Sequence, residues 1–140
     1  MLIDVSQYYA LIADFIVSIH FLYVMFVLFG QIIIILGWIF KWSFIRNPYF
    51  RILHFVAILI VAVQAILDVS CPLTLWENRL RSLAGQTVEW DISFIGRLLR
   101  LFVFYNFPSW FFTVLHVSFA GIVLLTLIFV PPKFRRTHIV

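Results

Sequence analysis

Residues 15–40 read FIVSIHFLYVMFVLFGQIIIILGWIF, a run that contains no Asp, Glu, Lys or Arg. At the 1.5 Å rise of an α-helix this run is roughly 39 Å long, more than the hydrocarbon core of a bilayer, which is about 30 Å thick. Tyr23, Gly30 and Gly37 recur at every seventh residue, and small residues at such spacing favour close packing against a second helix. We therefore predict a membrane-spanning helix over about residues 10–40.

The composition of the whole chain supports a membrane protein. Hydrophobic residues make up 64% of the 140 residues and charged residues only 11%, which is too few to cover the surface of a soluble domain. The net charge of +4 does not indicate nucleic-acid binding, because no basic run is interleaved with stacking aromatic residues. The single cysteine excludes an intramolecular disulfide and any multi-thiolate metal site built from this chain alone.

Two further apolar runs are long enough to span a bilayer. They lie at about residues 50–69 and 109–130, and the second ends at the pair Pro131 and Pro132. The basic residues flank these runs, and they are Lys41, Arg46, Arg51, Lys133, Arg135 and Arg136. With three spans, both basic groups lie on the cytoplasmic side, as the positive-inside rule requires. We therefore predict one all-α transmembrane domain over residues 1–140, located in the inner (cytoplasmic) membrane, with the N-terminus outside and the C-terminus in the cytoplasm.

The region between the second and third runs is less apolar and admits two interpretations. Only about 14 apolar-rich residues, 94–107, are available for a further span, and Arg97 and Arg100 fall near their middle. A cation at that depth costs about 2.5 to 3.5 kcal/mol on insertion scales. We therefore favour two interfacial or re-entrant helices, at about 74–84 and 93–106, over the alternative of a four-helix membrane bundle.

The stretch CPLTLWENRLR, residues 71–81, has the features of a helix start. Thr74 and Glu77 have the spacing of a capping box, so we expect Thr74 to cap the helix and Pro72 to end the preceding span. Glu77 and Arg81 are four residues apart with the acid first, the better order for an ion pair on a helix. Gly85 suits the C-terminal end of this helix.

The same stretch carries a resemblance to a known family. The residues that carry it are Cys71, Pro72, Leu73, Thr74, Glu77, Leu80, Arg81 and Gly85, supported by His20, Arg51, His54 and His116. This pattern resembles that of a bacterial family of small integral membrane proteins of unknown function. The resemblance implies a membrane protein and no particular activity.

Two histidines are candidate cofactor ligands. In the three-span topology, His20 and His116 lie at similar depth, both outside the middle of their spans. Two imidazoles facing each other among small and aromatic residues could ligate the iron of a haem b from both sides. A membrane histidine also commonly bonds to a neighbouring carbonyl or hydroxyl, and a copper or zinc site with Cys71 is a weaker alternative.

A second candidate site combines acids and arginines at the outer surface. It consists of Asp14, Asp68, Glu77, Arg81, Arg97 and Arg100. In a partly dehydrated interface these residues are expected to form ion pairs that attach the short helices to the spanning ones. The functional alternative is a pocket for a quinone or lipid headgroup, with walls made by Trp76, Trp90 and Trp110.

The sequence contains no enzyme motif that we recognise: there is no Gly-rich phosphate loop, no His-Glu-x-x-His and no nucleophile elbow. We therefore predict a non-catalytic accessory or structural subunit of a larger membrane complex. Its expected partners are membrane lipids and other integral membrane subunits, and no nucleic acid. The alternative function is electron transfer through haem b, or binding of a quinone, at His20 and His116.

Overall fold

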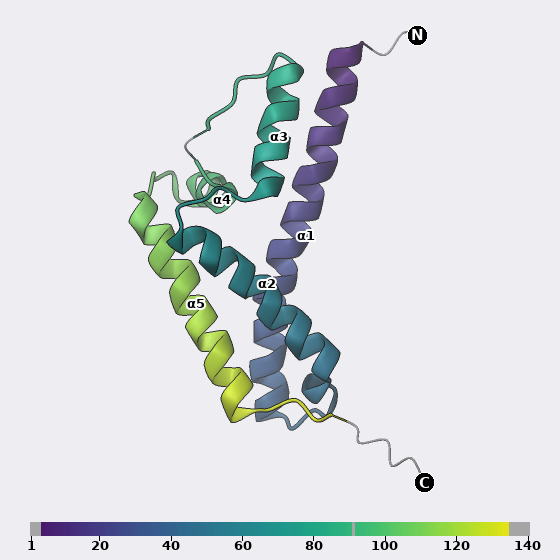
Figure 1. Cartoon of the computed structure of the whole chain (residues 1–140), viewed down its shortest axis with the longest axis vertical. Helices are drawn as coiled ribbons and strands as arrows, with labels where there is room; N and C mark the ends of the chain where they lie inside the picture. Colours follow the sequence, from purple (N-terminus) through teal and green to yellow (C-terminus); the bar gives the residue numbers. More distant parts are fainter. Residues whose placement is uncertain (1–3, 91, 135–140) are drawn as a thin grey trace.

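A computed structural model describes residues 4–90 and 92–134, which fold as helices joined by short connections (Figure 1). The elements are α1 (Val5–Ile39), the 3-10 helix η1 (Phe44–Arg46), α2 (Pro48–Ile66), α3 (Pro72–Leu83), α4 (Phe94–Val103) and α5 (Ser109–Phe129). The described residues contain no strand. The prediction of an all-α fold is confirmed.

Three of these helices, α1, α2 and α5, are long and apolar enough to cross a membrane. The other two are short: α3 has 12 residues and α4 has 10. Ten helical residues extend only about 15 Å, half of the hydrocarbon thickness. The prediction of three spans is therefore confirmed, and the four-span alternative is not, because the arginine-containing segment forms a helix too short to cross.

The three long helices diverge from a shared lower end in Figure 1. This end holds the end of α1, the start of α2 and the end of α5, and the backbone N–H of Lys133 donates to the carbonyl of Arg46 at 2.9 Å. From there α2 crosses α1 diagonally and packs against α5, while α3 lies beside the upper half of α1. Helix α4 is seen end-on near the upper ends of α2 and α5. The short helices therefore cover the upper end of the bundle.

The crossing of α1 and α2 is close because α1 offers glycines there. A Cβ atom added to Gly30 would lie 2.7 Å from Cδ2 of His54, and one added to Gly37 would lie 2.3 Å from Cγ2 of Ile45. The hydroxyl of Tyr23 donates to the carbonyl of Ala57 across the same interface. Positions 23 and 30 of the heptad series therefore face α2, as their spacing suggested, whereas position 37 faces Ile45 of η1.

Arg51 and His54 on α2 fasten the lower half of the bundle. The Nη2 of Arg51 donates to the carbonyls of Thr126 at 2.7 Å and Val130 at 3.0 Å. These carbonyls lie at the C-terminal end of α5, where the partial negative charge of the helix dipole attracts a cation. The Nε2 of His54 bonds to the carbonyl of Val27 at 2.8 Å. The two side chains therefore connect α2 to both other spanning helices.

The start of α3 differs from the expected capping box. The helix begins at Pro72, Cys71 occupies the N-cap position, and no side chain caps the helix. Thr74 lies inside the first turn, and Glu77 forms ion pairs instead. The physical reason is that proline has the backbone angle of a first helical residue and needs no N–H partner there, so it starts this helix and does not end α2. Gly85, with φ of +75°, terminates α3 as predicted.

Candidate functional site

The two short helices, α3 and α4, which we call the lid, bury different kinds of residue: α3 buries a polar face, whereas α4 buries Phe94 and Gly96. On α3 the buried residues are Thr74, Glu77 and Asn78, whereas Trp76 and Leu83 are exposed. A helix of a soluble protein has the opposite arrangement. The polar side of α3 therefore packs against α1 and α4, and its charges are paired inside the protein.

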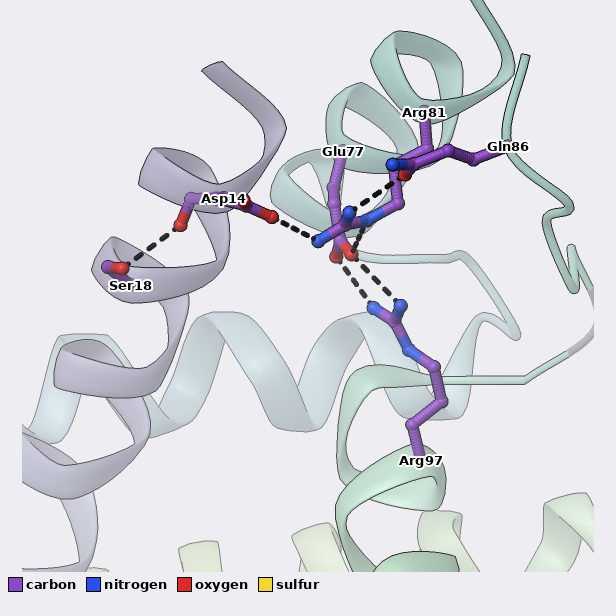
Figure 2. A network of polar contacts seen from close by, with 6 residues as sticks. All are labelled: Asp14, Ser18, Glu77, Arg81, Gln86 and Arg97. Carbon is purple, nitrogen blue, oxygen red and sulfur yellow. Dashed lines mark hydrogen bonds and ion pairs between the residues drawn. The ribbon is translucent and has the colours of Figure 1, made fainter. Parts of the chain in front are cut away.

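Glu77 is the centre of this polar side (Figure 2). Its side chain is 1% exposed, and both carboxylate oxygens are bonded. Arg97 of α4 binds it with two nitrogens, Nη2 to Oε2 at 2.6 Å and Nη1 to Oε1 at 2.9 Å. Arg81, one turn further along α3, donates from Nε to Oε1 at 2.8 Å. One buried carboxylate thus joins the two helices of the lid.

Arg81 extends the network to α1 (Figure 2). Its Nη2 donates to Oδ1 of Asp14 at 2.9 Å, and its Nη1 donates to Oε1 of Gln86 at 3.0 Å. Burial raises the pKa of Glu77, but the hydrogen bonds from Arg97 and Arg81 outweigh burial and leave this pKa below its ordinary value. Glu77 is therefore ionised at neutral pH and holds Arg81, which in turn links α3 to Asp14 of α1.

The structure brings together four of the six charged residues singled out in the sequence: Asp14, Glu77, Arg81 and Arg97. Arg100 pairs with Glu89. Glu89 was not predicted, because it lies in the connection between α3 and α4, where no helical spacing relates it to Arg100. Asp68 forms no ion pair within the described residues. It lies just after α2, with φ of +54°, and lines a cavity.

This cavity, of about 270 Å³, lies below the lid, between α1, α2, α3, α4 and α5, and is partly open to its surroundings. Its polar lining residues are His20, Gln64, Asp68, Ser70, Cys71, Thr74, Asn106, Ser109, Thr113 and His116, together with Ser93. Its aromatic lining residues are Trp90, Phe94, Phe107 and Phe112. Residues from all five helices thus meet at one hollow with mixed chemistry.

His20 forms one side of the cavity. Its ring is 7% exposed and stacks on Phe94 of α4, with centroids 4.1 Å apart. The Nδ1 of His20 is buried and has no hydrogen-bond partner among the described residues. Arg97 lies over the ring of Phe94, with Cζ 5.8 Å from the centroid. Phe94 therefore connects the ion-pair network to the wall of the cavity.

His116 lines the same cavity from α5. Its Nδ1 lies 2.6 Å from the carbonyl oxygen of Phe112. A carbonyl only accepts hydrogen bonds, so Nδ1 carries the proton, and in the neutral ring Nε2 is an acceptor. The structure therefore places both predicted histidines at one cavity and leaves Nε2 of His116 as its free ring nitrogen.

The size and lining of the cavity restrict what it holds. Its volume is just below the range of about 300 to 1,000 Å³ typical of sites for drug-sized ligands. It therefore suits a single ring better than the four-pyrrole macrocycle of haem. The described residues contain no group of three or more His, Cys, Asp or Glu side chains placed to hold a metal ion. All three tryptophans expected to form a wall are exposed, and of the three only Trp90 lines the cavity.

Taken together, the three long apolar helices and the lid define a small multi-pass membrane protein with a polar cavity at one end of its bundle. Residues 10–132 match a family described as "Protein of Unknown function (DUF2784)", and the chain belongs to this family. The match confirms the resemblance to a family of unknown function. Neither a curated protein nor a solved structure matches the chain.

Proposed function

We propose that this protein is an accessory subunit that binds a larger integral membrane protein along α1. The observation that carries the proposal is the length of α1. At 1.5 Å per residue, α2 and α5 extend about 28 and 32 Å, close to one hydrocarbon thickness, whereas α1, with 35 residues, extends about 52 Å. Because the three helices share a lower end, the first part of α1 extends beyond the other two (Figure 1).

The projecting part of α1 has an uncovered apolar face. About 20 residues counted from Ile39 fill the hydrocarbon core and reach His20, so roughly residues 5–19 lie beyond it. Within this part, Tyr8, Leu11 and Phe15 are exposed, and Phe15 has an exposed fraction of 66%. Burial of apolar surface contributes about 25 cal/mol per Å². A face of this kind outside the hydrocarbon core supports the presence of a partner that covers it.

The spacing of the exposed residues indicates the shape of the partner. The residues Tyr8, Phe15, Leu22, Phe29 and Leu36 recur every seventh position, and all are exposed. Leu11, Ile32 and Ile39 lie three residues after members of this series and are also exposed. This is the a/d pattern of a helix that packs along another helix. We infer that the occupant is an apolar helix of a different membrane protein, which follows α1 through the bilayer and beyond it.

The charges support an orientation. Among the described residues all carboxylates lie at the upper end: Asp4, Asp14, Asp68, Glu77 and Glu89. The basic residues next to the lower ends of the spanning helices are Lys41, Arg46, Arg51 and Lys133, and Arg135 and Arg136 follow in the sequence. The upper end carries the four arginines of α3 and α4, of which Arg81, Arg97 and Arg100 are paired with carboxylates. The positive-inside rule then supports a lower end in the cytoplasm and an upper end outside, in the inner membrane.

Photocrosslinking in intact cells tests the accessory role. A photoreactive side chain is placed at Leu11 or Phe15 on the projecting part of α1, and at Ile60, an exposed position of α2 within the bilayer, as the matched control. We expect a discrete protein adduct from positions 11 and 15 and mainly lipid adducts from position 60. Adducts of exactly two copies of this chain would contradict the accessory role, as would lipid adducts alone at all three positions.

A second function, axial ligation of haem b by His20 and His116, is supported by their shared cavity but not by its volume. An absorption spectrum of protein made in haem-replete cells tests it, since a stoichiometric Soret band would establish haem binding. We expect no such band.

A further inference from the structure

We propose that the cavity binds the ring of a lipid-soluble quinol, with His20 and His116 as its polar contacts and the oxidised quinone as a weaker ligand. This inference goes beyond the accessory role and does not depend on it, because the cavity lies under the lid and the partner face lies on the outside of α1. It concerns binding alone.

The depth of the cavity suits a molecule with a lipid tail and a polar head. His20 lies 19 residues, roughly 28 Å, along α1 from Ile39 at the lower end, which places it at the boundary of the hydrocarbon core. The upper ends of α2 and α5 contribute Gln64 and Ser109 to the same hollow. A ring bound here would be in a polar setting, while an attached tail leaves through the open side into the acyl chains.

Two histidines with unused nitrogens give the cavity its hydrogen-bonding character. The Nδ1 of His20 is buried without a partner among the described residues, and an unpaired buried polar atom is costly unless a ligand or water satisfies it. Nδ1 of His116 is committed to the carbonyl of Phe112, so Nε2 is the nitrogen left for a ligand, and in an uncharged imidazole it is an acceptor. An acceptor requires a hydroxyl donor, which a quinol has and a quinone lacks. This asymmetry is the reason for the predicted preference.

Two more lining side chains remain available for a ligand. Gln64 and Thr74 make no side-chain hydrogen bond to the described residues, and each can donate or accept. The aromatic rings of Phe94, Phe107 and Phe112 offer flat surfaces against which a ring can stack. The lining thus combines polar side chains with aromatic rings, and a small hydroxylated ring requires both.

The charges of the lining exclude other headgroups. Among the described residues that line the cavity there is no Lys or Arg, and the one charged group is the carboxylate of Asp68. A phosphate or carboxylate would therefore meet no cation and one repelling anion. The arginines of the ion-pair network are bound to Glu77, Asp14 and Glu89 and do not line the cavity. A neutral ligand fits this lining best.

Cys71 makes the proposal directly measurable. It is the only cysteine of the chain, it lines the cavity and it is partly exposed. The protein is placed in nanodiscs of zwitterionic lipid, free of quinone and oxygen, and the rate of alkylation of Cys71 by iodoacetamide is followed by mass spectrometry. The probes are a decyl-trimethylbenzoquinol, the matching quinone, whose fully substituted ring does not add the thiol, and decylbenzene, which has the tail and ring but no oxygen.

We expect the quinol to slow alkylation of Cys71 in a saturable way, the quinone to need a higher concentration, and decylbenzene to have no effect. His116→Leu, which removes the acceptor, raises the half-saturating quinol concentration about tenfold, whereas His116→Gln, which keeps an acceptor oxygen, changes it less than about threefold. The matched control combines Cys71→Ser with Ser82→Cys, an exposed position of α3 outside the cavity. Alkylation at that position should not respond to quinol.

Three results would overturn the proposal. They are an alkylation rate of wild-type Cys71 that no quinol concentration changes, equal protection by decylbenzene, and equal slowing at position 82. The first of these indicates that the cavity holds only water. Since wild-type protein gives all the essential comparisons, a failure of the His116 variants to fold leaves the test intact.

Discussion

Replacement of Glu77 by glutamine should release α4 from α3, a change that we call lid opening. The carboxylate is 1% exposed and accepts three hydrogen bonds, two from Arg97 and one from Arg81. Glu77→Gln removes the negative charge and one acceptor oxygen, and turns an amide N–H₂ toward a guanidinium. Arg81 keeps Asp14 and Gln86 as partners, but Arg97 has no other ion-pair partner within the described residues.

The expected cost follows from these contacts. A hydrogen bond to a charged group contributes about 1.5 to 3 kcal/mol, and breaking a fully buried ion pair costs about 3 to 5 kcal/mol. The side chains of Arg81 and Arg97 are partly exposed, so water recovers part of the loss. We therefore expect the free energy of lid opening to fall by about 3 kcal/mol, which is roughly a hundredfold in the opening equilibrium.

Hydrogen–deuterium exchange of the α4 backbone amides in nanodiscs measures this opening, because local opening exposes amides without unfolding the spanning helices. The matched control is Glu89→Gln, which removes a carboxylate from an exposed pair with Arg100 on the same lid. Exposed ion pairs contribute little, so exchange in α4 should change less than about threefold. The variant Asp14→Asn, at an exposed acid of the network, should lie between the two.

A double variant separates the ion pair from simple loss of packing. Replacing both partners by neutral groups is less costly than leaving one charge buried, so Glu77→Gln combined with Arg97→Gln should open less than Glu77→Gln alone. Equal exchange rates in Glu77→Gln and Glu89→Gln, or strictly additive effects in the double variant, would refute the reasoning.

Three further outcomes test other parts of the structure. Gly30→Ala forces a Cβ to within 2.7 Å of the buried ring of His54 and should destabilise the bundle by about 1 to 3 kcal/mol. Gly121→Ala is the control, because a Cβ at that position has open space around it and should not destabilise the bundle. An equally lowered melting temperature in both variants would contradict the α1–α2 contact. Acidification should open the lid only below a pH of about 4.3, the ordinary pKa of a glutamate carboxyl group. The pKa of Glu77 is lowered in the folded protein, so its stabilising contribution is complete above a pH of about 4.3 and is lost as the pH falls through the lowered pKa. Amide exchange in α4 that becomes faster between pH 7 and pH 5 in the wild type would disagree. A reporter enzyme fused after Val140 should be active only in the cytoplasm, and an external reporter would reject the proposed orientation.

Contacts within one helix, and the residue that ends a helix, could be predicted from the sequence. The pair Glu77 and Arg81 follows from i,i+4 spacing, and the left-handed turn at Gly85 follows from the freedom of glycine at that angle. The start of α3 was not, because Thr74 and Pro72 both carry start signals and the sequence does not rank them. In the structure α3 begins at Pro72, and Glu77 forms an ion pair with Arg97.

Contacts between distant residues required the tertiary structure. Asp14 and Arg81 are 67 residues apart, and Asp68, which has the same charge as Asp14, lies at the cavity and outside the network. Residue types alone do not distinguish these two acids, because the distinction depends on where α2 ends relative to α3. The same holds for Trp90, which lines the cavity while Trp76 points away from it.

The sequence by itself determined the class of protein, the helical fold and the number of spans, because hydrocarbon accepts only long runs of apolar residues with their backbone bonds satisfied internally. It also indicated that His20 and His116 lie at one depth, since depth along a helix is proportional to residue number. Only the tertiary structure decided that both histidines face one cavity, that Glu77 is buried between two arginines, and that α1 projects beyond its neighbours. These features depend on the crossing angles and rotations of the helices. The packing of the whole bundle sets these angles, so they cannot be predicted from any single helix.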